Sequence, residues 1–126
     1  MPWNTSYLPE LGAVMTIYSG VIPIESLTEA VKETLALAKE HDTHRFLADC
    51  SALKGGHSIV DLYYLAKLLE EADIKRGLRE ALVLPQLSAT ADDVRFWETT
   101  CQNRGFKVRV FNSMDSARVW LVGNEE

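Results

Sequence analysis

Apolar and polar residues follow two different periods along this chain, and these periods predict which segments are strands and which are helices. Apolar runs, or apolar and polar residues in alternation, predict strands at residues 3–8, 13–19, 45–50, 80–84 and 106–111. Apolar residues three or four positions apart predict helices at residues 24–41 and 58–73, a third that ends at Gly105, and a short one after Ser113. Because strands alternate with helices, we expect an α/β domain with a mostly parallel sheet of four or five strands and four helices.

The two ends of the sheet are expected to differ from its middle. The segment Pro9-Glu10-Leu11-Gly12 is a turn signal, since proline presets its own φ and glycine accepts a positive φ. Strands joined by so short a turn pair antiparallel, so residues 3–8 should form an antiparallel edge strand. Residues 106–111 alternate apolar side chains with Lys107 and Arg109, which predicts a half-exposed strand at the opposite edge.

The order of the strands predicts how the helices cover the sheet. If the strands lie side by side in chain order, right-handed crossovers place every helix on one face. The opposite face would then carry a mixture of apolar and charged residues: Met15, Ile17, Leu47, Asp49, Lys107 and Arg109. Because an apolar surface with a rim of opposite charges can pair with its own copy, we expect a homodimer through this face.

Capping residues mark the expected helix ends. The expected N-terminal caps are Ser26 with Glu29 (or Pro23, a turn earlier), Ser58 with Asp61, Thr90 with Asp93, and Ser113. Gly105 should end the third helix, with Phe106 placed to make the apolar contact of a Schellman motif.

Composition narrows the classes of protein that this chain can belong to. Its 126 residues fit a single domain, 1–126, and 47% hydrophobic residues are normal for a globular protein. A net charge of -5 counts against sequence-independent nucleic-acid binding. The two cysteines form neither a disulfide framework nor a zinc set, and we expect no metal and no cofactor. With no signal peptide at the N-terminus and no apolar run of about 18 residues, we expect a soluble cytoplasmic protein that does not enter a membrane.

The segment from Phe46 to Asp61, FLADCSALKGGHSIVD, carries the most specific pattern. A buried strand runs into the polar residues Asp49-Cys50-Ser51, and a loop with Gly55-Gly56 leads to the helix start at Ser58. In α/β domains, the carboxyl end of a strand and the start of the next helix are where binding sites form.

This segment, together with the order of the elements, resembles the STAS family of SpoIIAA-like anti-sigma factor antagonists. In that family a strand ends in an Asp-Leu-Ser-like signature, and a helix begins with Asp-Ser-Ser-Gly, whose first serine is phosphorylated. Asp49-Cys50-Ser51 matches the strand signature and Ser58 falls on the phosphoserine, while His57 and Val60 replace the aspartate and the glycine. The resemblance implies a SpoIIAA-like fold and a regulatory role. Residues 96–121 look more like a divergent bacterial branch of unknown function, which is similar to the CRAL-TRIO fold that holds an apolar ligand.

Each candidate site residue also has a structural explanation. Ser58 can serve as the helix cap, with or without phosphorylation. The segment Gly55-Gly56-His57-Ser58 could cradle an anion, but a flexible turn is favoured. Cys50, Asp49 and His57 are the residue types of a nucleophile, an orienting group and a base, yet both Cys50 and Cys101 fit better in an apolar core.

The aromatic and basic residues also have both a functional and a structural explanation. In the second helix, the expected inward stripe is Ile59, Leu62, Ala66 and Leu69. Four aromatic residues could line an apolar pocket, although a place in the core is favoured: Tyr63, Tyr64, Phe96 and Trp97. His41 and His44 lack a third metal ligand, and the basic residues Lys75, Arg76 and Arg79 are expected to neutralise a helix end.

The sequence therefore favours a non-catalytic module of the STAS type that binds an unidentified protein partner. Its working surface would lie at residues 51–64, with Ser51, Asp61 and a switch at Ser58. Two alternatives stay open. The first is a binding module for a lipid-like, apolar small molecule held between the helices and the sheet, and the second is a small cysteine-dependent enzyme.

Overall fold

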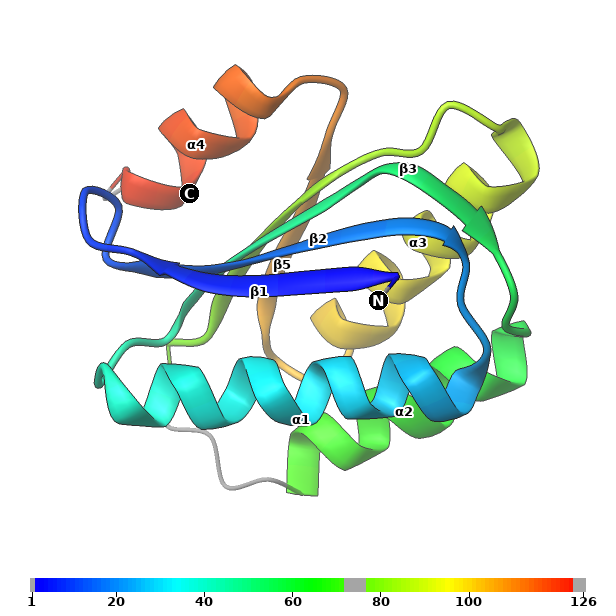
Figure 1. The fold of residues 1–126 in the computed structure, drawn as a ribbon, viewed down its shortest axis with the longest axis horizontal. Helices are drawn as coiled ribbons and strands as arrows, with labels where there is room; N and C mark the ends of the chain where they lie inside the picture. The colour runs from blue at the N-terminus through cyan, green and yellow to red at the C-terminus, as the bar shows by residue number, and fades with distance from the viewer. Residues whose placement is uncertain (1, 72–76, 124–126) are drawn as a thin grey trace.

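The computed structural model describes residues 2–71 and 77–123 and shows an α/β domain built on one mixed sheet (Figure 1). The strands are β1 Trp3–Leu8, β2 Ala13–Val21, β3 Arg45–Gly55, β4 Arg79–Val83 and β5 Lys107–Phe111. The helices are α1 Ile24–Glu40, α2 Ile59–Glu71, α3 Ser88–Gln102 and α4 Met114–Val122. None of these helices, within the residues that the structure describes, is long and apolar enough to cross a membrane.

The strands lie side by side in chain order, β1-β2-β3-β4-β5, which is the order that the expected placement of the helices took as a condition. β1 pairs antiparallel with β2, and the other neighbouring strands pair parallel. The tight turn after Leu8 explains the antiparallel pair, because a parallel pair needs a longer crossover. Both predicted edge strands, residues 3–8 and 106–111, are confirmed as the edges of the sheet.

Helices cover both faces of the sheet, which corrects the expectation that all of them share one face. α1, α2 and α3 lie on one side, while α4 lies on the other side, across β3, β4 and β5 (Figure 1). The first three helices are crossovers between parallel strands, so their side is fixed by handedness. α4 follows the last strand and connects to no further one, so it is free to fold onto the open face.

This position of α4 removes the premise of the expected dimer face. Leu47 is only 1% exposed, because it packs in a second apolar cluster with Ala117 and Leu121 of α4. Arg79 is also buried on this face, where its guanidinium lies over the Trp120 ring and donates a hydrogen bond to the Trp120 carbonyl. Arg79 therefore belongs to the core under α4 rather than to a basic cluster, and the other two predicted members, Lys75 and Arg76, lie outside the described residues.

β3 is longer than the five or six residues predicted, because two irregularities interrupt its pairing with β2 without ending it. The register shifts after the pair Ile17↔Asp49 and again before Val21↔Gly55, and each shift adds one residue to β3. A bulge of this kind leaves a backbone N–H without a ladder partner. At the first bulge, the Asp49 carboxylate accepts hydrogen bonds from the Ser51 N–H (3.1 Å) and hydroxyl (2.7 Å).

The helix ends confirm some caps and correct others. α1 begins at Ile24 with Pro23 as its N-cap and no side-chain cap, so the Ser26–Glu29 box is wrong. α3 begins at Ser88, which makes Thr90 a buried residue of the first turn instead of a cap. The Schellman motif after α3 is confirmed, since the N–H groups of Gly105 and Phe106 donate to the carbonyls of Gln102 and Cys101. The Ser113 cap is also confirmed, and the predicted end of the second helix at Asp73 falls outside the described residues.

Candidate functional site

The start of α2 is held by a reciprocal cap. The Ser58 hydroxyl accepts the Asp61 N–H (3.1 Å), and the Asp61 carboxylate accepts the Ser58 N–H (2.9 Å). This arrangement satisfies two backbone donors that a helix start would otherwise leave free, and the carboxylate also suits the positive end of the helix dipole. The predicted cap is confirmed, and Ser58 itself is exposed.

We expect Ser58→Ala to lower the free energy of unfolding by about 1 kcal/mol, because the variant loses one cap hydrogen bond. Ser58→Asp should retain most of that stability, since aspartate also caps a helix and its charge is favourable there. Urea denaturation of each form provides the measurement. Ser26→Ala is the matched control, because Ser26 lies within α1 and caps nothing; an equal loss in Ser26→Ala and Ser58→Ala would contradict the assignment.

Gly55 and Gly56 hold the loop before α2 against the loop that leads into α1. The Ile22 N–H donates to the Gly55 carbonyl at 2.8 Å, and a Cβ on Gly56 would lie 2.6 Å from the backbone of Ile22. Both glycines have a positive φ, 108° and 111°. The glycine pair therefore makes a specific close contact between two loops, in place of the flexible turn that the sequence suggested.

Asp49, Cys50 and His57 are not assembled as an orienting group, a nucleophile and a base. Cys50 points toward the helices and is buried, and burial raises the pKa of its thiol far above the usual range. Asp49 lies on the opposite face of β3 and is bonded to Ser51. The His57 Nδ1 lies 3.3 Å from the Ile22 carbonyl, so His57 fastens the same two loops that the glycines bring together.

The four aromatic candidates divide between the inside and the outside of the domain. Trp97 is a buried core residue and Phe96 is half-buried against the core, whereas Tyr63 and Tyr64 are 46% and 62% exposed. The favoured place in the core is wrong for both tyrosines. The inward stripe of α2 consists of Leu62, Leu65, Ala66 and Leu69, and positions 63 and 64 fall outside it.

An exposed apolar patch covers the outer side of the first two turns of α2. Ile59, expected to face inward, is 51% exposed, and Val60 is 61% exposed. Together with Tyr63 and Tyr64, whose rings meet edge to face at 5.8 Å, they form a patch that we call the α2 patch. Residues three and four positions apart are neighbours on a helix, so the four side chains are contiguous. Ser58 directly precedes the patch in the chain.

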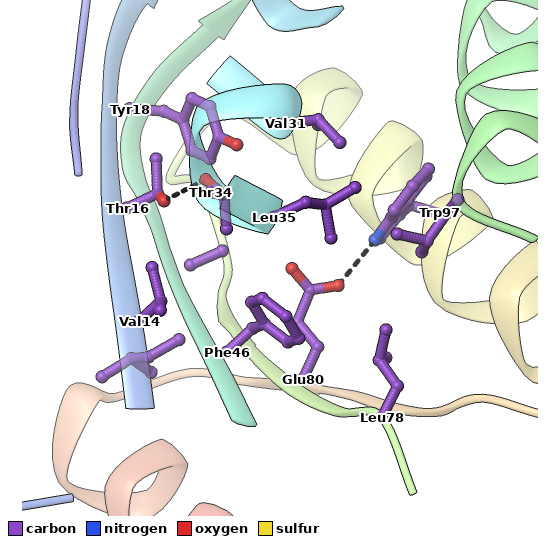
Figure 2. Close-up of a pocket in the computed structure, with 13 residues that line it drawn as sticks. Val14, Thr16, Tyr18, Val31, Thr34, Leu35, Phe46, Leu78, Glu80 and Trp97 are labelled. Carbon is purple, nitrogen blue, oxygen red and sulfur yellow. Dashed lines mark hydrogen bonds between the residues drawn. The ribbon is translucent and has the colours of Figure 1, made fainter. Parts of the chain in front are cut away.

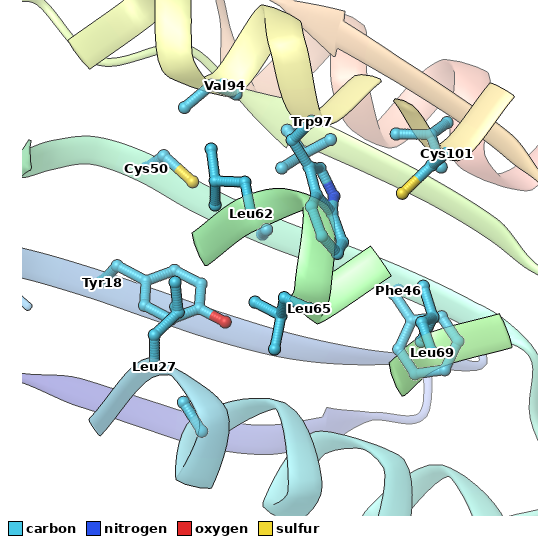
Figure 3. Packing of buried hydrophobic residues seen from close by; sticks show 14 of the residues in the cluster. Tyr18, Leu27, Phe46, Cys50, Leu62, Leu65, Leu69, Val94, Trp97 and Cys101 are labelled. Carbon is cyan, nitrogen blue, oxygen red and sulfur yellow. The ribbon is translucent and has the colours of Figure 1, made fainter. Parts of the chain in front are cut away.

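A second feature is a partly open cavity between the sheet and the helices α1, α2 and α3 (Figure 2). It has two adjoining parts of about 40 and 70 Å³. The two parts share five lining residues: Tyr18, Val31, Ala48, Glu80 and Trp97. Apolar side chains such as Leu27, Leu62 and Leu65 line the larger part, and Figure 3 shows them packed near Tyr18 and Trp97. A cavity of this size holds a few water molecules or one small molecule, whereas sites for drug-sized ligands span roughly 300–1,000 Å³.

Glu80 is the charged side chain that both parts of the cavity share. It extends from β4, and one carboxylate oxygen accepts the Trp97 indole N–H at 3.0 Å (Figure 2). Burial raises the pKa of Glu80 to about 7, and the indole hydrogen bond opposes this shift only in part. From the sequence, Glu80 was expected only as the first residue of a strand. The period of two in β4 was the available signal, because it places Glu80 on the same inward face as Leu82.

Tyr18 presents the second polar group to the cavity. The side chain is buried, and its hydroxyl points into the space between β2 and Trp97 (Figure 2). Burial, with the nearby Cys50 and Glu80 as smaller causes, raises the pKa of Tyr18 well above its usual value, so the phenol stays neutral at physiological pH. By contrast, the hydroxyls of Thr16 and Thr34 in the same wall satisfy each other at 2.8 Å.

Among residues 2–71 and 77–123, no group of three or more His, Cys, Asp or Glu side chains could hold a metal ion. His41, one of the two histidines considered as ligands, instead stacks on the Tyr7 ring at 3.8 Å. Comparison of the chain with protein-family models, curated proteins and solved structures found no match, so the resemblance to the STAS family stays a prediction from the sequence motif.

Proposed function

We propose that this domain is a non-catalytic regulatory module that binds a protein partner through the α2 patch. The α2 patch is the observation that carries this proposal. Contiguous exposed apolar groups are uncommon on proteins that act alone, and aromatic side chains such as tyrosine are enriched at protein interfaces. The patch also falls within residues 51–64, where the resemblance to the STAS family implies the working surface.

The proposal includes a switch at Ser58. This serine is exposed, so a kinase could reach it, and it directly precedes Ile59, the first residue of the α2 patch. A phosphoryl group there would bring two negative charges next to the Asp61 carboxylate, which now accepts the Ser58 N–H. The repulsion would displace Asp61 and change the charge beside the patch, and an apolar or acidic partner surface would then bind less tightly.

Site-specific photo-crosslinking in living cells tests the patch. Tyr64→benzoylphenylalanine should give a discrete crosslinked adduct, which Val60→Lys should abolish by placing a charge in the same contact. Val119→benzoylphenylalanine is the matched control, because Val119 is 72% exposed on α4, on the other side of the sheet. Absence of an adduct from position 64, or the same adducts from both positions, would contradict the proposal. An adduct with a second copy of this chain would show that the partner is the same protein and that the patch forms a homodimer.

The same crosslinking experiment also tests Ser58 as the switch. Ser58→Asp should reduce the yield of the adduct at position 64 several-fold, while Ser58→Ala should leave it close to the unmodified level. Equal yields from the two variants would leave the patch as the binding surface and remove Ser58 as its switch.

A second candidate function is binding of a small ligand between the helices and the sheet. The cavity beside Glu80 favours it, because pockets with apolar walls and a few convergent polar groups are where proteins bind small molecules. The cavity has room for a small molecule rather than for a lipid chain.

A further inference from the structure

The cavity between the sheet and the helices presents two polar groups that the domain itself does not satisfy. The Glu80 carboxylate accepts one hydrogen bond, from Trp97, and its second oxygen has no partner among the described residues. The Tyr18 side chain is only 9% exposed, and its hydroxyl has no hydrogen-bond partner within the same residues. Figure 2 shows both groups directed into the cavity. Both groups therefore face the open space of the cavity, where water or a small ligand can supply the hydrogen bonds that the domain does not.

The chemistry of the walls restricts what such a ligand can be. The other polar or titratable side chains on the cavity wall are Thr16, Thr34, Cys50, His57 and Asp93. None of the described lining residues is a lysine or an arginine, so the protein supplies no permanent cation to the Glu80 carboxylate. Asp93, from α3, adds a second carboxylate to the larger part of the cavity, and α2 contributes only leucines. The cavity is thus apolar, acidic and without a cation of its own.

We propose that this cavity binds a small molecule with a primary ammonium group on a short apolar body, through the Glu80 carboxylate and the Tyr18 hydroxyl. An ammonium group has three donors and can satisfy both acceptors at once. The aromatic rings of Tyr18 and Trp97 add a further attraction for a cation. The apolar body would extend among Leu27, Leu62 and Leu65, where it replaces water against leucine side chains. The limited volume excludes a long acyl chain, so the ligand belongs to the class of short alkyl or aryl amines.

This inference rests on the second candidate function, ligand binding, and is independent of the α2 patch. Its test uses three probes of equal length: butylammonium, butanol and butyrate. Binding is followed by NMR through the indole N–H resonance of Trp97, with the indoles of Trp3 and Trp120 as internal references away from the cavity. Butylammonium at millimolar concentration should shift the Trp97 resonance saturably, butanol should bind at least tenfold more weakly, and butyrate should not bind.

Variants then assign the contacts. Glu80→Gln keeps an oxygen that can accept the Trp97 N–H but removes the charge, so it should reduce the affinity for butylammonium to that for butanol. Tyr18→Phe should reduce the affinity several-fold. Glu33→Gln is the matched control and should change nothing, because Glu33 also accepts an indole N–H at 3.0 Å, from Trp3, but does not line the cavity.

Protonation of Glu80 gives an independent readout. Because burial raises the pKa of Glu80 to about 7, the ionised fraction falls roughly tenfold from pH 8 to pH 6, and the apparent affinity for butylammonium should fall with it. Glu80→Gln should remove this dependence, while His57→Gln, which removes the titratable imidazole on the cavity wall, should keep it.

The outcomes separate the two proposals. If butanol and butylammonium bind equally well to the wild type and to Glu80→Gln, the cavity binds small apolar molecules and the ammonium inference is wrong. If no probe shifts the Trp97 indole, water alone fills the cavity, and both the inference and the ligand-binding function are wrong.

Discussion

Gly56→Ala is expected to destabilise the domain more than a glycine-to-alanine substitution at any of its other glycines. The new Cβ would lie 2.6 Å from the backbone N and O of Ile22, and backbone atoms cannot rotate away as a side chain can. The φ of 111° is also unfavourable for every residue with a side chain. We expect a loss of about 3 kcal/mol or more in the free energy of unfolding, which is a large part of the stability of a small domain. Chemical denaturation measures the loss.

Gly55→Ala separates the two causes. Gly55 has nearly the same positive φ, 108°, but a Cβ there would meet only the Thr90 Oγ1, at an ordinary contact distance of 3.9 Å. This variant should therefore show the backbone strain without the clash, about 1–3 kcal/mol. Equal losses in the two variants would show that the Ile22 contact contributes nothing, and that Gly55 and Gly56 are no more than a permissive turn. A larger loss in Gly56→Ala would show that the two loops must touch for the domain to be stable.

The stability of the domain should fall as the pH rises from 5 to 8, by up to about 3 kcal/mol from Glu80 alone. Burial raises the pKa of Glu80 from 4.5 to about 7, so between these values the folded state holds a proton that the unfolded state has released. The stability due to this proton is fully present below the unfolded-state pKa and is lost as the pH passes through the folded-state pKa. Urea midpoints across this pH range measure the effect.

Glu80→Gln should abolish the decline while leaving the fold intact, because its amide oxygen can still accept the Trp97 N–H. At pH 5 the variant should match the wild type, and at pH 8 it should be the more stable of the two. Glu33→Gln should keep the decline, since Glu33 is exposed beside Trp3. A wild-type midpoint that stays constant from pH 5 to pH 8 would mean that the Glu80 carboxylate is hydrated well enough to ionise normally.

The two large effects have a common structural origin. Gly56 allows the loop before α2 to contact the backbone of Ile22. This contact fixes the N-terminal end of α2, whose side chains line the larger part of the cavity. Glu80 forms the floor of the same cavity from β4. A strong destabilisation by Gly56→Ala and a pH effect at Glu80 would therefore both report on the packing between α2 and the sheet.

Much of the fold was predictable from local patterns. The α/β alternation, the antiparallel edge strand, the Ser58 and Ser113 caps and the Schellman motif after α3 all depend on residues close together in the chain. These features have a strong local physical cause, such as a cap hydrogen bond or a turn that accepts only glycine. The sequence also indicated Pro23 as one of two possible N-terminal caps of α1, the other being Ser26.

Some predictions were wrong because one sequence pattern is compatible with more than one structure. The polar residues Asp49-Cys50-Ser51 read as the end of a strand, yet Asp49 stabilises a bulge and the strand continues to Gly55. Tyr63 and Tyr64 are apolar enough for a core, and only the rotation of α2 on its neighbours turns them outward. A helix with apolar residues on more than one side does not itself specify which side is buried.

The sequence by itself determined the α/β alternation, the antiparallel edge strand and the capped start of α2, since each follows from contacts between near neighbours in the chain. Only the tertiary structure decided that α4 closes the second face, that Gly56 touches Ile22, and that Glu80 and Tyr18 share one cavity. These relations join residues that are far apart in the chain, and no local pattern encodes the distance between them. The candidate sites, the α2 patch and the cavity, both arise from how α2 packs, which is why the sequence alone could name Ser58 but not the surfaces on either side of the helix.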